Sequence, residues 1–262
     1  MAVTPRSAAL DGRVAVVTGA AQGIGRATAL ALAEFGADVV MGDRDEAGLA
    51  TAAKEVEATG RRASTAVLDV RDTAAVGAWI AGVPRVDVLV NNAGGGFHSF
   101  FADISAKGQQ ALVDENFTSV TNLVRACLPV ISPGGSIINV TSVEAFRAAP
   151  GFSVYAAMKA AVEQLTRTLA IELCDRRIRV NCVAPDAIPT PGDAGLAQAV
   201  GAMTDYGAVV PLGLGTTDDC AAAIVFLAGD LSRFMTGTTL HVDGGTDAAR
   251  GWRRRPDGGW SP

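Results

Sequence analysis

The chain has 262 residues and carries 22 Lys and Arg against 27 Asp and Glu, a net charge of −5. This acidic balance excludes a basic nucleic-acid-binding protein. Hydrophobic residues make up 49% and charged residues 19%, which excludes a disordered acidic segment and supplies enough apolar side chains for a large core. The length fits one α/β domain over residues 1–262, although length alone would also allow two.

Short β-branched runs alternate with longer Ala- and Leu-rich stretches of helical period from Arg13 onward. The predicted strands are residues 14–18, 38–42, 63–68, 86–90, 136–141, 178–184 and 239–242. The predicted helices are residues 23–35, 46–59, 73–81, 107–128, 154–173 and 218–229. The strand runs carry little charge, as expected of strands covered on both faces, so the pattern predicts βαβ units around a parallel sheet.

Two segments depart from this alternation. Residues 186–215 contain three prolines and several glycines around a weak helical pattern at 194–203, and we predict a substrate lid there. The tail, residues 246–262, is basic and contains two tryptophans, Trp252 and Trp260. It is interpreted either as a frayed end or as a segment that packs against a neighbouring subunit.

Nothing in the composition predicts a membrane or metal partner. No apolar run reaches the ~18 residues that cross a bilayer, and residues 1–13 lack a hydrophobic signal core, so we expect a cytoplasmic protein. The four cysteines have no CxxC spacing and there are only two histidines, which predicts buried, inert thiols and no metal site.

A glycine-rich turn follows the first predicted strand. Thr18 and Gly19 are followed by Gly23 and Gly25 at the start of a helix, where backbone amides and the helix N-terminus could approach a pyrophosphate. The spacing is G-x-x-x-G-x-G and not the G-x-G-x-x-G dinucleotide pattern, and such turns also occur without a ligand. The turn alone is therefore a weak indication of a nucleotide site.

Asp43 ends the second predicted strand and lies where an acidic residue can accept hydrogen bonds from an adenosine ribose. Its charge would repel a 2′-phosphate, which favours NAD over NADP. Arg44 follows directly and could pair with such a phosphate, so NADP remains an alternative. Asp43 could also simply cap a turn.

Three further residues suggest catalysis. Tyr155 and Lys159 are four apart on a predicted helix, hence on one face, although this spacing is also common on helix surfaces. Ser142 follows the strand predicted at 136–141, at the carboxyl end where parallel sheets place their ligands.

Taken together and in order, these residues resemble the short-chain dehydrogenase/reductase family from about Leu10 to Gly245. The resemblance rests on the glycine turn, Asp69-Val70 after the third strand, Asn91-Asn92-Ala93-Gly94 after the fourth, Asn116, Ser142, Tyr155-x-x-x-Lys159 and Val242-Asp243-Gly244-Gly245. It implies a single-domain, doubly wound, Rossmann-like α/β fold with seven parallel strands, and hydride transfer between a nicotinamide and an alcohol or carbonyl carbon. It also implies a homotetramer.

The resemblance assigns roles to these residues. Tyr155 would be the general acid/base, Lys159 would lower its pKa and hold the nicotinamide ribose, Ser142 would orient the substrate oxygen and Asn116 would support a relay water. A free tyrosine titrates near pKa ~10, and a nearby cation favours its phenolate form. The implied cofactor contacts are Gly19, Gln22, Gly23, Ile24, Gly25, Asp43, Arg44, Asp69, Val70, Asn91, Ala93, Gly94, Tyr155, Lys159, Pro185, Ile188 and Thr190.

The substrate cavity is expected to be lined by Gly95, Phe97, Glu144, Phe146, Asp186, Met203 and Tyr206. Asp186 stands where the family usually has a glycine, and its effect on substrate choice does not follow from the sequence. Glu144 could bind a substrate hydroxyl or amine, or could face solvent at the rim. Leu214 stands where an arginine is frequent in the family.

Three functions follow as hypotheses. The first is an NAD(H)-dependent oxidoreductase acting on a small secondary alcohol or ketone, apolar and hydroxysteroid-like or cyclic. The second is an NADPH-dependent 3-oxoacyl-thioester reductase. Its acyl-carrier partner would be acidic and would bind best to a basic rim around the active-site cleft. The third is a dinucleotide sensor without turnover, which would not need the four residues with catalytic roles.

Overall fold

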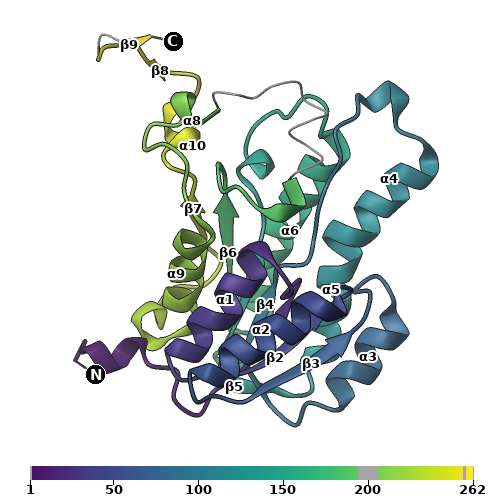
Figure 1. Ribbon diagram of the computed structural model, residues 1–262, viewed down its shortest axis with the longest axis vertical. Coiled ribbons are helices and arrows are strands. Elements are labelled where there is room, and N and C mark those ends of the chain that lie inside the picture. The colour runs from purple at the N-terminus through teal and green to yellow at the C-terminus, as the bar shows by residue number, and fades with distance from the viewer. Residues whose placement is uncertain (1, 194–205, 256–257, 262) are drawn as a thin grey trace.

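A seven-stranded parallel sheet forms the centre of the molecule in the computed structural model, which describes residues 2–193, 206–255 and 258–261 (Figure 1). The strand order is β3-β2-β1-β4-β5-β6-β7, with the crossover between β3 and β4 that defines a doubly wound sheet. The strands are β1 (Val14–Thr18), β2 (Asp38–Asp43), β3 (Ala63–Val67), β4 (Val86–Asn91), β5 (Ile131–Val140), β6 (Arg179–Pro185) and β7 (Thr239–Val242). This confirms the fold class expected from the sequence.

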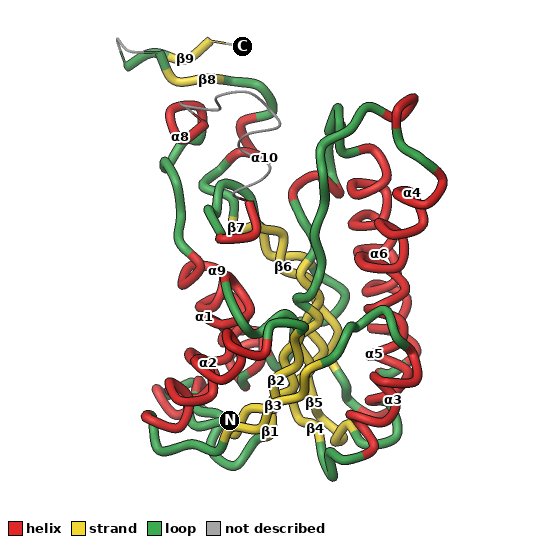
Figure 2. Tube along the Cα trace, turned by 45° about the vertical axis from the view of Figure 1, so that its right-hand side comes forward, coloured by secondary structure: helices red, strands yellow, loops and turns green. Residues whose placement is uncertain are grey.

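Helices cover both faces of this sheet (Figure 2). The helices are α1 (Gly23–Glu34), α2 (Glu46–Ala58), α3 (Thr73–Ala81), α4 (Ala106–Val113), α5 (Ser119–Cys127), α6 (Ser153–Glu172), α8 (Tyr206–Val209), α9 (Thr217–Ala228) and α10 (Thr246–Ala249). One core cluster joins the sheet to α1, α2 and α9, and the other joins it to α3, α5 and α6. Both faces of the central strands are therefore covered, which explains why the strands carry little charge.

Short polar side chains fix where several helices begin. The carboxylate of Asp45 accepts the amide of Gly48 at the start of α2, and that of Asp72 accepts the amides of Ala74 and Ala75 at the start of α3. Each cap satisfies backbone donors that have no partner within the helix. The helices therefore begin close to the positions that the sequence predicts.

One predicted helix is interrupted. We expected a single helix over residues 107–128, but α4 and α5 are separated by a π-helical turn, η3 (Asp114–Thr118). Within it, the Nδ2 of Asn116 donates to the carbonyl of Leu112 at 3.0 Å and to that of Gly95 at 2.8 Å. The widened turn thus places the buried Asn116 amide against the loop that follows β4.

The fifth strand begins earlier than expected, at Ile131 instead of 136, because Ile131 pairs with Val86 before the register shifts at Val88 and Ser136. The tail forms α10 and a two-stranded hairpin of β8 (Arg253–Arg254) and β9 (Trp260–Ser261), which projects from the sheet (Figure 1). The helical pattern expected at 194–203, with Met203, lies outside the described residues.

Candidate functional site

The glycine turn brings the backbone of β1, α1 and the β4 loop close together. Gly19 has φ +67°, and a methyl group there would lie 2.8 Å from the side-chain nitrogen of Asn92. A methyl group on Gly25 would lie 2.0 Å from the carbonyl oxygen of Gly19. Only glycine allows this approach, which leaves the N-terminus of α1 open at the carboxyl edge of the sheet. This backbone cradle fits a dinucleotide pyrophosphate.

Asp43 lies beside this turn at the end of β2. Its Oδ2 accepts the amide of Ala21 at 3.0 Å, and its Oδ1 accepts the amides of Arg44 at 2.6 Å and Asp45 at 3.1 Å. These backbone donors hold the carboxylate in a fixed position. Arg44 is 61% exposed and lies 3.6 Å from Glu115, so its guanidinium is only loosely held.

A narrow pocket next to the turn contains three of the predicted cofactor residues. Val70, Asn91 and Ala93 line it together with Thr18. The Oδ1 of Asn91 is buried and has no hydrogen-bond partner among the described residues. A buried acceptor without a donor is costly, but this pocket is too small to admit even a water molecule, so a bound nucleoside would have to lie outside it. Asp69, which follows β3, is hydrogen-bonded to Arg71, and this bond lowers the pKa of its carboxyl.

The loop after β4 passes closely over the predicted catalytic residues. A methyl group on Gly94 would lie 3.0 Å from the Oδ1 of Asn116 and 3.1 Å from the Nζ of Lys159. A methyl group on Gly96 would lie 3.2 Å from the ring of Tyr155. The glycines of this loop therefore let one backbone segment meet three side chains that come from η3 and α6.

Lys159 ties α6 to the end of β5. Its Nζ donates to the carbonyl of Val140 at 3.1 Å and lies 5.5 Å from the centre of the Tyr155 ring. Thr141 donates to the carbonyl of Lys159 at 2.8 Å. Burial lowers the pKa of Lys159 to about 8. Ser142 follows Thr141, so these contacts place the ammonium, the phenol and the serine on adjoining elements.

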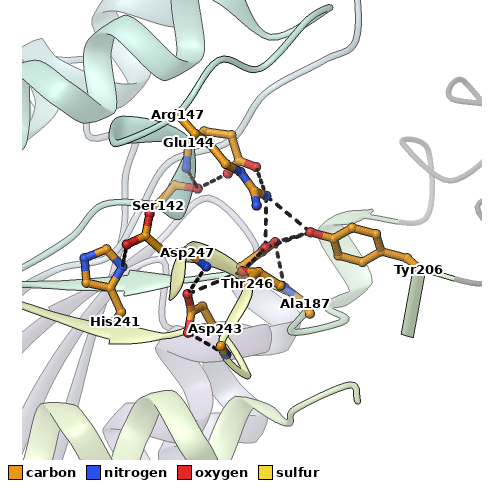
Figure 3. Close-up of polar contacts among 11 residues, drawn as sticks. Ser142, Glu144, Arg147, Ala187, Tyr206, His241, Asp243, Thr246 and Asp247 are labelled. Carbon is orange, nitrogen blue, oxygen red and sulfur yellow. Dashed lines mark hydrogen bonds and ion pairs between the residues drawn. The ribbon is translucent and has the colours of Figure 1, made fainter. Parts of the chain in front are cut away.

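Ser142 is hydrogen-bonded to Glu144 at one end of a group of polar and charged side chains that bind one another (Figure 3). The hydroxyl of Ser142 donates to the Oε2 of Glu144, and the other oxygen of Glu144 accepts from the Nη2 of Arg147 at 3.0 Å. The same nitrogen donates to the Oδ2 of Asp186 at 3.0 Å and to the Tyr206 hydroxyl at 3.3 Å. We call these five residues the serine network.

Asp186 is the most densely bonded member of the serine network. It accepts from the hydroxyls of Tyr206 at 2.7 Å and Thr246 at 2.6 Å, and from the amide of Ala187 at 2.9 Å. Ala187, not Asp186, takes the positive φ of this turn, at +55°. Burial and the bond to Asp186 raise the pKa of Tyr206 to about 12. The carboxylate that replaces the usual glycine thus joins β6, α8 and α10.

The remaining predicted residues divide between these two regions. Gln22 and Ile24 flank the start of α1, and a methyl group on Gly23 would lie 3.3 Å from the Cβ of Thr190. Pro185 ends β6, and Ile188 packs against Gly215. Phe146 packs on His241 at 4.7 Å between ring centroids, whereas Phe97 is 42% exposed beside Gly108. Gly95 donates its amide to Asn116.

Sequence reasoning missed Arg147 and Thr246. Arg147 is the only charged residue between Glu144 and Lys159, which is a signal that could have identified it. Thr246 follows the Gly244-Gly245 pair and gives no comparable signal, because only the fold brings it to Asp186.

The chain is similar to known proteins over most of its length. A family model described as enoyl-(acyl carrier protein) reductase matches residues 19–247. The chain is 37% identical to the 3-oxoacyl-[acyl-carrier-protein] reductase FabG of Thermotoga maritima, over 90% of this chain and 98% of that protein. It is also 37% identical to 3beta-hydroxysteroid dehydrogenase 1 of Eggerthella lenta, over 90% of this chain and 94% of that one.

Solved structures show the same fold. Carveol dehydrogenase from Mycobacterium avium, in complex with NAD, superposes with a TM-score of 0.84 at 33% identity, covering 90% of this chain and 97% of that one. The chain belongs to the short-chain dehydrogenase/reductase family. It is an oxidoreductase that acts on CH–OH groups with a nicotinamide dinucleotide. Among the described residues, no helix is long and apolar enough to span a membrane, and no group of side chains could hold a metal ion.

Proposed function

We propose that this oxidoreductase uses NAD(H) to interconvert a secondary alcohol and its ketone, with an apolar, hydroxysteroid-like or cyclic substrate. The observation that carries the proposal is the junction of α6 with the end of β5, where Lys159 binds the Val140 carbonyl and its Nζ lies 5.5 Å from the centre of the Tyr155 ring. When bound, the nicotinamide supplies or accepts the hydride. The chain's own residues handle the proton and the orientation of the substrate.

In this proposal Tyr155 gives or takes the proton at the substrate oxygen, and Ser142 orients that oxygen. The Lys159 ammonium beside the phenol favours the phenolate form, because an opposite charge stabilises the ionised group. Asn116, whose amide is held by the Gly95 and Leu112 carbonyls, supports a relay water at the widened turn. These four residues are the ones a dinucleotide sensor would not require.

Asp43 is the basis for choosing NAD. Three backbone amides fix its carboxylate beside the glycine turn, where a 2′-phosphate would meet its charge. Arg44 is the residue that could offset this repulsion. The 3-oxoacyl-thioester reductase remains the rival, since several relatives carry that name. An acidic carrier would be repelled by the acidic chain, and Leu214 leaves the rim without the usual arginine.

One assay separates these functions. The absorbance of the reduced nicotinamide is followed with NAD⁺ and a panel of steroid and alicyclic alcohols, and in parallel with NADPH and 3-oxoacyl thioesters. We expect turnover in the first arm. Turnover only in the second arm would replace both the substrate class and the cofactor, and turnover in neither would favour the sensor.

The same proposal includes the organisation of the protein. We propose one catalytic domain that works as a cytoplasmic homotetramer, through surfaces that include α4, α5 and α6. The predicted lid, residues 186–215, would border the substrate cavity, and the tail would either fray or pack against a neighbouring subunit. Sedimentation of the purified chain as a monomer would contradict the tetramer without affecting the proposed reaction.

A further inference from the structure

The hydroxyl proton of Ser142 is already used in a hydrogen bond to Glu144. A serine hydroxyl has one proton to donate and two lone pairs to accept with. Here the proton goes to the Oε2 of Glu144, and the oxygen accepts the backbone amide of Glu144 at 3.3 Å. If Ser142 is to donate to a substrate oxygen, as the proposed function requires, this proton must leave Glu144.

Glu144 is a firmly placed acceptor. Its Oε1 receives the Nη2 of Arg147, and Arg147 is anchored in turn by Asp186. Hydrogen bonds to Glu144 and Tyr206, with the attraction of Asp186, outweigh burial and raise the pKa of Arg147, so the guanidinium stays charged. The Glu144 side chain is 22% exposed, so its Oε2 is held beside Ser142 without being sealed from a ligand.

Freeing the serine proton without compensation is costly. A hydrogen bond to a charged group contributes about 1.5–3 kcal/mol, which corresponds to about a 10- to 150-fold effect on binding. A substrate with a second donor beside the reacting oxygen would replace the lost bond, because the donor would take the place of Ser142 on Glu144. The number of hydrogen bonds would then be conserved on binding.

The second donor belongs on the carbon next to the reacting one. Two acceptors that share one hydroxyl donor lie about 4–5 Å apart, a gap that a vicinal hydroxyl can bridge. A hydroxyl is sufficient because Glu144 already shares the charge of Arg147 with Asp186 and needs only one further donor at its Oε2. We propose that Glu144 is a specificity-determining residue that selects vicinal diols, by accepting the second hydroxyl and releasing the Ser142 proton to the reacting oxygen.

The experiment rests on the proposed function and compares three alicyclic alcohols with NAD⁺: 1,2-cyclohexanediol, 2-methoxycyclohexanol and cyclohexanol. The methoxy compound keeps the second oxygen but cannot donate. We expect kcat/KM for the diol to exceed that of both others by about tenfold or more, carried mainly by KM. Equal kcat/KM for the diol and the methoxy compound would overturn the inference, whereas no oxidation of these alcohols or of the steroid alcohols in the first assay would overturn the proposed function itself.

Glu144→Gln tests the residue. Arg147 would keep the amide oxygen, so the amide nitrogen would face Ser142 and could donate but not accept. The preference for the diol over the methoxy compound is expected to disappear or invert, with KM for NAD⁺ unchanged. Glu55→Gln alters a similar Glu–Arg pair, with Arg26 on α1, outside the serine network, and should keep the preference for the diol.

Dissociation constants provide a readout that does not depend on turnover. The diol and the methoxy compound are titrated into the protein with NADH, and quenching of the nicotinamide fluorescence is followed. The wild type should bind the diol about tenfold more tightly, and Glu144→Gln should not. A diol preference that survives in Glu144→Gln would show that another group selects the second hydroxyl.

Discussion

The site has a cofactor half and a substrate half, and the first is formed mainly by backbone groups whereas the second is formed mainly by side chains. The cofactor half, at the ends of β1, β2 and β4, is made largely of backbone: glycines without room for a methyl group, and a carboxylate held by three amides. The substrate half, at the ends of β5, β6 and β7, is made of charged side chains that bind one another. The first half is therefore sensitive to added atoms, and the second to a lost partner.

The largest effect is expected at the phenol of the substrate half. Tyr155→Phe removes the group that exchanges a proton with the substrate oxygen, and general acid–base catalysis contributes about 10²- to 10⁴-fold. We expect kcat to fall by that factor while the dissociation constant for NADH, measured by fluorescence, stays within about twofold. A variant that keeps a tenth or more of the wild-type kcat would contradict the role proposed for Tyr155.

The cofactor half is tested by adding one methyl group. Gly25→Ala places a carbon 2.0 Å from the Gly19 carbonyl, so the turn must move. Overpacking of this kind costs about 1–3 kcal/mol, and we expect binding of NADH to weaken by up to about a hundredfold. Gly77→Ala is the matched control, because a methyl group there meets nothing within 4 Å. Equal NADH affinity in both variants would mean that the glycine turn does not hold the dinucleotide.

The sequence predicts the cofactor half better than the substrate half, for a physical reason. A site formed by the backbone requires particular residues close together in the sequence, such as the glycines at 19, 23 and 25 and Asp43 at the end of β2. The serine network joins residues from Ser142 to Tyr206, and Asp186 also binds Thr246 of α10, a contact that no local sequence pattern indicates. Sequence reasoning named Glu144, Asp186 and Tyr206 singly but could not foresee that Arg147 would join them.

The widened turn at η3 was missed for a related reason. Residues 107–128 have a continuous helical period, and nothing local marks a break. The interruption accompanies bonds between the Asn116 amide and the Gly95 carbonyl, a contact between segments that are distant in sequence. The early start of β5 was also missed, because it depends on pairing with β4. The other predicted strands and helices follow from local apolar patterns and caps and lie within one residue of their predicted bounds.

The smallest expected effect is on the free energy of unfolding. It arises in the substrate half, which buries the ammonium of Lys159. Burial lowers the pKa of Lys159 from 10.5 to about 8, so below pH 8 the folded chain carries a charge that burial disfavours by roughly 3 kcal/mol. Between pH 8 and 10.5 the unfolded chain binds a proton that the folded chain does not, so this penalty is relieved as the pH rises through that window.

Lys159→Met should therefore stabilise the protein at pH 7 while abolishing activity. Losing the bond to Val140 costs about 1–3 kcal/mol, which leaves a net gain of about 1 kcal/mol in the free energy of unfolding. Urea unfolding at neutral and alkaline pH measures it, and the gain should shrink and reverse as the pH passes 8. A variant that is less stable than the wild type by the same amount at both pH values would show that the buried charge carries no such penalty.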